Sequence, residues 1–344
     1  MTKIYDFAYS VALVRTLETM LLNENEVERM MLAPSATDAF KILNEFDYAD
    51  NKAGIDSPSD FQKVITEGLM DIKKTLTKIT PDKRMLNIIL HQYDFHNIKT
   101  MIKAKISGKT YEDIKTLLSD MGAIPTEALK NYILEDITNT SFELTERTEK
   151  YIKKIIKKVQ ELFEKEKNPQ VIDLYLDQKL MKIIYGITLD SKSDFLVQYV
   201  KKLIDINNIK LFFRMKSQEK PLQLYEMAFL WNGNVPYTSF KDAYSHGLGT
   251  FPELMKNTPY AKIIETGYRH YEEEKTFIYL EKEAENYLTN FIKRAKLTAF
   301  GPGPLIAYFL AKKNNALVIR MIMVNKLNNI DPEEIRSRLR ELYS

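Results

Sequence analysis

The chain has 344 residues, with 50 Lys and Arg against 47 Asp and Glu, no Cys, 11 Gly and 12 Pro. The absence of Cys excludes a disulfide framework, a thiolate metal site and a cysteine nucleophile, and the near balance of charge leaves no basic footprint for nucleic acid. Few Gly and Pro argue against the many tight turns of a β-sandwich or barrel. No apolar run approaches the ~20 residues of a membrane span. We therefore expect a soluble, all-α protein.

Apolar residues recur with helical periodicity along most of the chain. The pattern predicts helices over residues 59–80, 83–106, 141–167, 170–185, 190–216, 260–297 and about 304–327. Pro81, Gly186 and the run Gly301-Pro-Gly-Pro304 are expected to separate successive helices, because these residues end helices or begin new ones. Val235-Pro-Tyr-Thr-Ser reads as a loop that enters a helix, and strand-like alternation is nowhere sustained.

Internal repetition is the most informative feature of the sequence. Three segments align without gaps: YDFHNIKTMIKAKI at 93–106, IDINNIKLFFRMKS at 204–217 and NNALVIRMIMVNKL at 314–327. Their first residues, 93, 204 and 314, are spaced by 111 and 110 positions. A nearly constant spacing of this size indicates copies of one supersecondary unit. We predict three such units, over residues 1–107, 108–217 and 218–344.

The repeated polar positions lie beside the apolar stripe of the predicted helix rather than opposite it. In chain order they are Asp94, Asn97 and Lys99, then Asp205, Asn208 and Lys210, then Asn315, Val318 and Arg320. A buried carboxylate must be paired or hydrogen-bonded, so we expect the two Asp to hold a neighbouring helix or a backbone amide. The basic members of the motif are candidate partners. In the third copy Asn315 replaces the Asp and Val318 replaces the Asn. Because residues required for chemistry in every copy would not vary in this way, the motif is interpreted as structural.

Each repeat also contains a second helix start. Thr110-Tyr-Glu-Asp and Asp331-Pro-Glu-Glu both begin thirteen residues after the second motif position, and both resemble a capping box. Asn23-Glu-Asn-Glu looks like a related element near the N-terminus, while the middle copy, near Ser217 to Met227, is looser.

The other candidates for chemistry are weak. His91 and His96 are five residues apart, which is not the i, i+4 spacing of a helical zinc pair, and His246 and His270 stand apart from them. Gly301-Pro-Gly-Pro304 lacks the Lys and Ser or Thr of a phosphate loop. We expect no catalytic residue, no cofactor site and no metal site. The Lys-rich helix within 147–167 is expected to be a solvated face, with a surface for anionic headgroups or an acidic partner as the alternative.

The C-terminal run GPGPLIAYFLAKKNNALVIRMIMVNKLNNIDPEEIRSRLRELY at 301–343 resembles the signature of the C subunit of the archaeal-type and bacterial V-type ATPases. This family is similar to the d subunit of the eukaryotic vacuolar proton pump. The resemblance includes the D-x-x-N-I-K motif and the stretch VRTLETMLLNENEVERMMLAPSATDAFKILNEFDYAD at 14–50, and so extends over nearly the whole chain.

The resemblance implies a funnel of three pseudo-threefold-related helical units, without catalytic activity of its own. It implies the D- and F-type shaft subunits in the funnel and the proteolipid rotor ring on the other side as partners, with no nucleic acid and no small-molecule substrate. The expected role is that of a rotor coupler of the central stalk, peripheral on the cytoplasmic face of the membrane. The alternative from the repeats alone is an independent helical scaffold that binds a peptide or protein.

Overall fold

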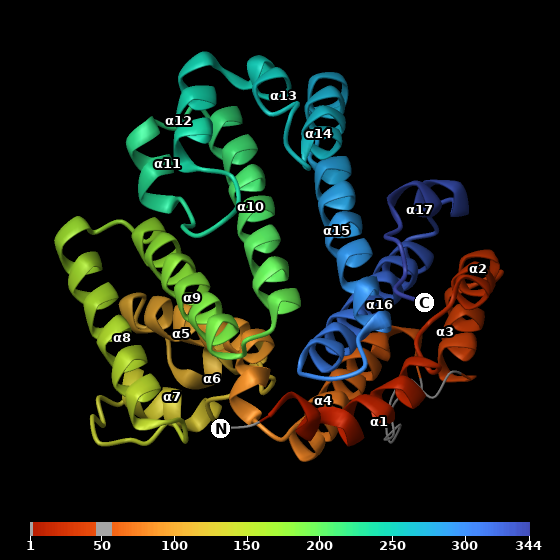
Figure 1. Ribbon diagram of the computed structural model, residues 1–344, viewed down its shortest axis with the longest axis horizontal. Helices are drawn as coiled ribbons and strands as arrows, with labels where there is room; N and C mark the ends of the chain where they lie inside the picture. The colour runs from red at the N-terminus through yellow and green to blue at the C-terminus, as the bar shows by residue number, and fades with distance from the viewer. Residues whose placement is uncertain (1–2, 46–56) are drawn as a thin grey trace. The chain divides into compact units, whose positions relative to one another are not determined.

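The computed structural model describes residues 3–45 and 57–344, and every regular element in these ranges is an α- or 3-10 helix (Figure 1). The all-α prediction is therefore confirmed for the described part of the chain. Residues 46–50, with which the N-terminal stretch of the resemblance ends, lie outside the described residues. No described helix combines the length and the apolar character that crossing a bilayer requires.

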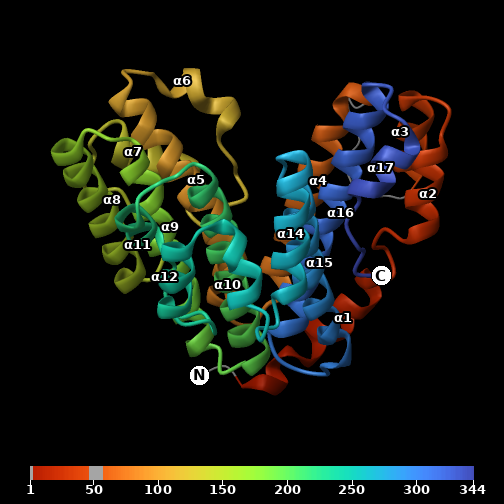
Figure 2. The ribbon, with the colours of Figure 1, turned by 90° about the horizontal axis from the view of Figure 1, so that it is seen from above.

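The chain divides into two compact units. The first is formed by residues 1–86, 193–202 and 248–344. Its α-helices are α1 (Ala8–Glu18), α2 (Glu24–Leu32), α3 (Ala36–Glu45), α4 (Phe61–Ile79), α13 (Phe251–Leu254), α14 (Ala261–Glu274), α15 (Ile278–Ile292), α16 (Gly303–Leu327) and α17 (Pro332–Arg338). Within it α16 packs against α1, α2, α3, α4 and α15, and α14 lies along α15 (Figure 2).

The second unit is formed by residues 87–192 and 203–247. It contains α5 (Asn87–Ile106), α6 (Tyr111–Ile114), α7 (Thr126–Ile133), α8 (Glu146–Glu166), α9 (Gln170–Asp190), α11 (Leu222–Ala228) and α12 (Tyr237–His246), with the greater part of α10 (Asp194–Ser217). Helices α5, α9 and α8 lie side by side, and α11 packs on α9 (Figures 1 and 2).

Helices α8 and α16 differ in how many of their sides are apolar and buried. On α8, Thr145 caps the first turn, and the buried residues Ile152, Ile155, Ile156, Val159 and Phe163 form a single stripe. Helix α16 begins at Gly303 after Pro302 and is buried on several sides, from Leu305 to Met323. Pro is favoured in a first helical turn because its missing N–H has no partner there. The expected joint at 301–304 is therefore confirmed.

Two predicted boundaries are wrong. Gly186 lies inside α9, which continues to Asp190, because a single Gly costs a helix only about 1 kcal/mol and packing outweighs that amount. The segment 260–297 is interrupted rather than continuous: α14 ends at Glu274, Lys275 adopts a left-handed φ of 54°, and α15 starts at Ile278. Gly267 lies inside α14 and allows α15 to pack closely against it, since a Cβ there would come within 2.6 Å of the Leu280 side chain on α15.

Candidate functional site

The repeated motif of α5 holds the loop that leads into α7. Asp94 is fully buried, and its Oδ1 accepts a hydrogen bond from the backbone N–H of Ile124 at 2.9 Å. Asn97 binds both backbone groups of Ser119, donating to its carbonyl at 2.8 Å and accepting from its N–H at 2.9 Å. A backbone amide, one of the two kinds of partner expected for Asp94, is thus the one observed.

The second copy repeats these contacts in α10. Asp205 accepts from the N–H of Val235 at 3.1 Å and from that of Asn234 at 2.9 Å. Asn208 donates to the carbonyl of Leu230 at 2.8 Å and accepts from its N–H at 2.9 Å. In both copies the Asp reaches 30 residues ahead and the Asn 22 residues ahead. The repeat is therefore one of contacts as well as of sequence.

Each of these loops passes so close to the Asp that only Gly fits. A Cβ on Gly122 would lie 2.1 Å from Asp94 Oδ1, and one on Gly233 would lie 2.1 Å from Asp205 Oδ1. Real Cβ atoms do not approach a carboxylate so closely, so the two glycines allow the loop to rest on the carboxylate. Sequence reasoning missed this role, although Gly occurs 28 positions after the Asp in both copies.

A lysine completes the arrangement. Lys105 donates to the carbonyl of Ile133 at 2.7 Å, and Lys216 donates to the carbonyl of Tyr244 at 2.6 Å. These carbonyls lie in the last turns of α7 and α12, where helix carbonyls lack partners and a cation is favourable. We call this arrangement the clamp of each copy. It consists of the Asp or Asn at the first motif position, the Asn at the second position where one is present, this Lys, and the backbone groups that they bind.

The third clamp is completed from the other end of the chain. Asn315, with its carboxamide oriented to satisfy both of its polar atoms, accepts from the N–H of Leu22 at 2.6 Å. Lys326 donates to the carbonyl of Ala33 at 2.8 Å. These two contacts bracket α2, just as the other clamps bracket α7 and α12. In the third clamp α2 therefore occupies the position that α7 and α12 occupy in the other two.

The location of α2 corrects the expectation that Asn23-Glu-Asn-Glu is a counterpart of the helix starts at Thr110 and Asp331. Helices α6, α11 and α17 are the members of that series, since they begin 111 and 110 residues apart at 111, 222 and 332. The capping-box pattern of Asn23 is real, because Asn23 and Glu26 bind each other's backbone N–H. It marks a helix start without saying to which helix of the repeat it belongs.

Val318 replaces the Asn of the other copies, and a different pair of side chains holds the equivalent stretch of backbone. Asn286 on α15 accepts from the N–H of Glu341 at 2.9 Å, and Asn314 donates to the carbonyl of Glu341 at 2.7 Å. Val318 is fully buried in the apolar cluster that joins α2, α3 and α16. Neither Asn286 nor Asn314 could be found from the alignment, since neither occupies a repeated polar position.

Two of the basic residues of the motif, Lys99 and Arg320, bind groups other than the motif Asp. Lys99 donates to Asp177 on α9 at 2.6 Å, and Arg320 donates to Gln62 at 3.1 Å. Lys210 lies on α10 and is partly exposed. The neighbouring pair Lys103 and Asp173, at 2.7 Å, joins the same two helices, α5 and α9. These contacts fasten the motif helix sideways, while the clamp fastens the loop that follows it.

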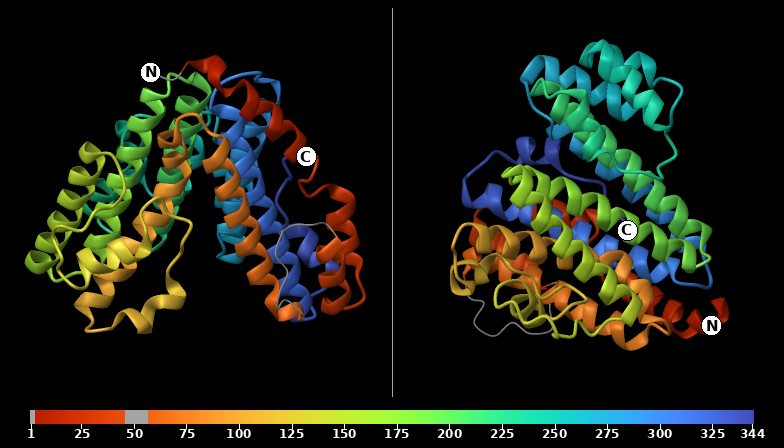
Figure 3. Two further views of the ribbon diagram at one scale, coloured as in Figure 1. Left: turned by 90° about the horizontal axis from the view of Figure 1, so that it is seen from below. Right: turned by 90° about the vertical axis from the view of Figure 1, so that its left-hand side faces the viewer.

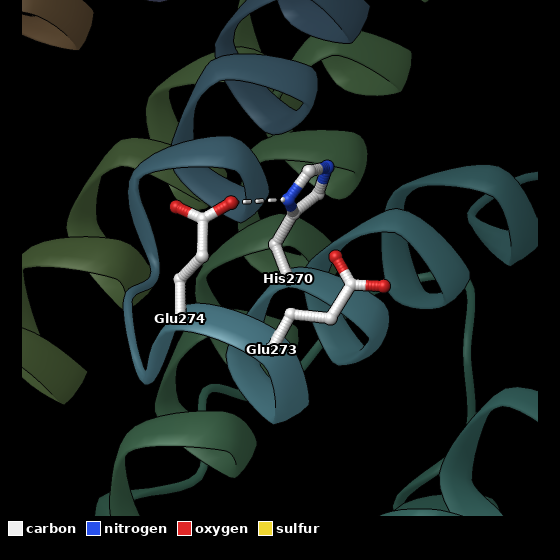
Figure 4. A group of neighbouring side chains, drawn as sticks. All are labelled: His270, Glu273 and Glu274. Carbon is white, nitrogen blue, oxygen red and sulfur yellow. Dashed lines mark hydrogen bonds and ion pairs between the residues drawn. The ribbon is translucent and has the colours of Figure 1, made fainter.

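Two groups of titratable residues lie outside this scheme. His91 is buried and donates from Nδ1 to Asp94 Oδ2 at 2.7 Å, and the alignment places Lys202 and Lys312 at its position in the other copies. His270, Glu273 and Glu274 lie close enough together to bracket an ion (Figure 4). However, His270 Nδ1 is bound to Glu274 at 3.1 Å, its ring stacks on Tyr279, and both carboxylates are exposed.

The lysines of α8 pair mainly with glutamates of the same helix. Lys150 binds Glu146 at 2.6 Å, Lys153 binds Glu149 at 2.8 Å, and Lys158 binds Glu161 at 3.3 Å. Hydrogen bonding to Lys150 lowers the pKa of Glu146, and hydrogen bonding to Lys153 lowers that of Glu149. Such i, i+3 and i, i+4 pairs are typical of a solvated helix face, the first of the two interpretations offered for this helix.

Taken together, the Asp, Asn and Lys residues of the clamps hold backbone groups. In each clamp the oxygens accept from backbone N–H groups and the lysine donates to a helix-end carbonyl. Burial raises the pKa of Tyr225 well above its usual value, so its hydroxyl stays neutral beside the carbonyl of Asn208. Such an arrangement can fix the shape of a loop, which is a mechanical rather than a chemical task.

Comparison with known proteins agrees with this view. Residues 10–338 match the family model of the ATP synthase (C/AC39) subunit. The C subunit of the A-type ATP synthase of Methanocaldococcus jannaschii is 26% identical over 97% of this chain and 86% of its own length. The C subunit of the V-type sodium ATPase of Enterococcus hirae is 24% identical, with 96% and 97% covered. The chain therefore belongs to the ATP synthase (C/AC39) subunit family, whose members are non-catalytic subunits of a rotary ATPase complex.

Proposed function

We propose that this chain couples the central shaft of a V-type or A-type rotary ATPase to the proteolipid rotor ring and transmits torque between them. The match to the C subunits of such complexes along nearly the whole chain carries this proposal. In this role the chain sits peripherally at the cytoplasmic face of the membrane, with the D- and F-type shaft subunits on one side and the ring on the other.

The clamps support a mechanical role. A part that transmits torque must resist local yielding, and loops are the parts of a protein that yield most easily. Here buried Asp and Asn side chains hold the loop before α7 through at least three hydrogen bonds. They hold the loop before α12 through at least five. Breaking buried hydrogen bonds of this kind is costly, which favours a single loop geometry under load.

We further propose that three units, near residues 1–107, 108–217 and 218–344, close into a funnel with pseudo-threefold symmetry. The equal reach of the clamps, 22 and 30 residues in two copies, supports a common design. The placement of α2 in the third clamp supports closure, because the first segment of the chain completes the last unit. The funnel is expected to receive the tip of the shaft.

Reconstitution tests the coupling role. The ATPase complex, assembled in vesicles with and without this chain, is compared for ATP hydrolysis and for ion pumping in the same preparation. We expect hydrolysis by the soluble head to continue without the chain and pumping to be lost, and we expect added chain to restore pumping. Pumping at an equal rate in its absence would overturn the proposal, as would failure of the chain to bind either the shaft subunits or the detergent-solubilised ring.

A further inference from the structure

An exposed apolar surface lies at the start of the chain, in the first unit. It is formed by the 3-10 helix η1 (Ile4–Phe7), the first turn of α1, and the segment after α15, where η6 (Lys293–Leu297) leads toward Gly301. We define the N-terminal patch by its five large exposed side chains, whose exposed fractions are 53% for Ile4, 69% for Tyr5, 72% for Tyr9, 91% for Leu297 and 41% for Phe300.

The two segments of the N-terminal patch touch each other. The rings of Tyr5 and Phe300 meet edge to face, with centroids 5.3 Å apart. Arg15 on α1 donates to the carbonyls of Ala295 and Thr298 at 2.6 and 2.9 Å, which fixes the second segment against the first helix. Figures 1 and 3 show the start of the chain and the connection between α15 and α16 running side by side. The apolar side chains therefore share one continuous surface.

The two segments that carry these side chains are rich in basic residues. Within residues 3–9 and 293–300 there are four cations, Lys3, Lys293, Arg294 and Lys296, against a single acid, Asp6. This excess is local, since the whole chain has a formal charge of only +3 on 344 residues. The guanidinium of Arg294 and the ammonium of Lys296 lie over the rings of Phe291 and Tyr343, 5.3 and 4.8 Å from the ring centroids, and both residues are exposed.

We propose that the N-terminal patch binds the surface of a lipid bilayer that contains anionic headgroups. Tyr and Phe are favoured at the membrane–water interface, where the ring lies among headgroups and the hydroxyl stays hydrated. Basic residues add attraction to the negative surface of such a bilayer. A combination of exposed aromatic and aliphatic side chains with a basic rim is the pattern of an interfacial anchor.

The shape of the patch favours lipid over a folded protein partner. Leu297 projects at the end of η6 with 91% of its surface exposed. A projecting side chain is buried by a rigid partner only where that partner has a matching pocket, whereas a fluid bilayer adapts to it. Helix α8 lacks this combination, since none of the exposed large apolar side chains of the described residues lies on it.

The test uses the full-length chain alone, so it does not depend on assembly of the ATPase. Binding is measured by flotation with vesicles of phosphatidylcholine, with and without added phosphatidylserine, at low and at high salt. We expect binding to the anionic vesicles, weakened by salt because the headgroup attraction is screened. Leu297→Asp and Tyr9→Ser should each reduce the partition coefficient at least about fivefold by removing apolar insertion.

A charge variant separates the two contributions. Lys3→Gln with Lys293→Gln should reduce anionic binding by roughly tenfold or more, since each basic residue near such a surface contributes about fivefold. Two matched controls should bind like the wild type. They are Leu117→Asp, at a leucine with 59% exposure in the second unit, and Lys154→Gln with Lys157→Gln, which removes two exposed lysines of α8.

Each contrary outcome overturns the inference. Absence of binding to anionic vesicles would do so, as would loss of binding in the α8 control while the patch variants still bind. Binding of the N-terminal patch only to detergent-solubilised proteolipid ring, without vesicle binding, would assign the patch to a protein partner. That last result would overturn the lipid inference and leave the coupling role intact. Failure of coupling with retained vesicle binding would overturn the coupling role and leave the lipid inference intact.

Discussion

At the scale of single residues, backbone amides hold both buried carboxylates of the clamps, and His91 adds a hydrogen bond to Asp94. A buried carboxylate costs several kcal/mol in lost hydration, and oriented N–H groups compensate for this without a mobile cation. Asp94 and Asp205 each hold the N–H of the residue that precedes a Pro, Pro125 or Pro236, at the entry to a helix. The carboxylate therefore fixes where that helix begins.

Replacing Gly122 and Gly233 tests how closely the two loops approach the carboxylates of Asp94 and Asp205. Gly122→Ala and Gly233→Ala should each lower the free energy of unfolding by about 2 kcal/mol, because the new Cβ displaces a buried carboxylate from its amides. Urea denaturation followed by far-UV circular dichroism measures the change. Gly186→Ala is the matched control: a Cβ there meets nothing within 4 Å, so in mid-helix it should stabilise by up to about 1 kcal/mol. Equal effects at all three positions would refute the close contact.

A second substitution tests the polarity of the Asn contact. Asn208→Ala should cost about 1–3 kcal/mol by leaving the backbone groups of Leu230 without partners. Asn208→Asp should cost at least as much, since one carboxylate oxygen then faces the Leu230 carbonyl oxygen in place of an N–H donor. If Asn208→Asp unfolds at the same urea concentration as the wild type, the two-way hydrogen bond is not the reason for this residue.

At this scale the sequence predicted part of the clamp. Asp94, Asp205 and their Asn companions stood out because polar residues recurred beside an apolar stripe. Lys105, Lys216 and Lys326 went unnoticed although Lys is identical in the three aligned segments, because a basic residue near a helix end is ordinarily solvent-exposed. Their carbonyl partners are set by tertiary packing, which local periodicity cannot reveal.

At the scale of helices, α2 depends on contacts with the far end of the sequence. Beyond the third clamp, Glu28 on α2 forms an ion pair with Arg336 on α17 at 2.7 Å. The apolar cluster around Val27, Met30 and Met31 includes residues of α16 and α17. Sequence periodicity predicted many helices correctly but could not show this exchange, because hydrophobic pattern identifies a buried face and not its partner.

The pair of Glu28 and Arg336 gives a prediction for acid conditions. Hydrogen bonding from Arg336 lowers the pKa of Glu28 below its ordinary value of 4.5. A carboxylate with a lowered pKa in the folded state contributes stability that is full above 4.5 and is lost as the pH falls through the folded value. Glu28→Gln should therefore lower the denaturation midpoint near neutral pH, and the difference from wild type should shrink as the pH falls below 4.5. A constant difference would contradict this linkage.

At the scale of the whole chain, both termini belong to one compact unit. Tyr343 is fully buried, and its hydroxyl donates to Glu18 on α1 at 2.9 Å, while Ser344 donates to the carbonyl of Leu22. The proposed repeat boundaries at 107 and 217 rest on the aligned segments of the sequence, whereas the compact units describe packing. Sequence repetition could predict the former but not the latter, because packing joins residues 1–86 to 248–344.

Buried Tyr343 should be essential to the first unit. Tyr343→Ala is expected to lower the free energy of unfolding of that unit by about 3–5 kcal/mol, the usual cost of removing a buried aromatic ring. Hydrogen exchange should accelerate in α1 and α16 and stay unchanged in α5 and α9. Trp231→Ala, at a tryptophan with 53% exposure in the second unit, is the control and should cost far less. Faster exchange spread evenly over both units would contradict this localisation.

The closing of the third clamp by α2 also has a consequence for protein synthesis. Lys326 and its acceptor Ala33 are separated by 293 positions, so α2 leaves the ribosome long before α16 exists. At about 5–20 residues per second, the interval is roughly 15–60 s. During that time α3 and α4 can cover part of the apolar face of α2, while the part that α16 and α17 cover in the folded chain stays open to chaperones. The packing of α2 is thus completed only after α16 and α17 have been translated.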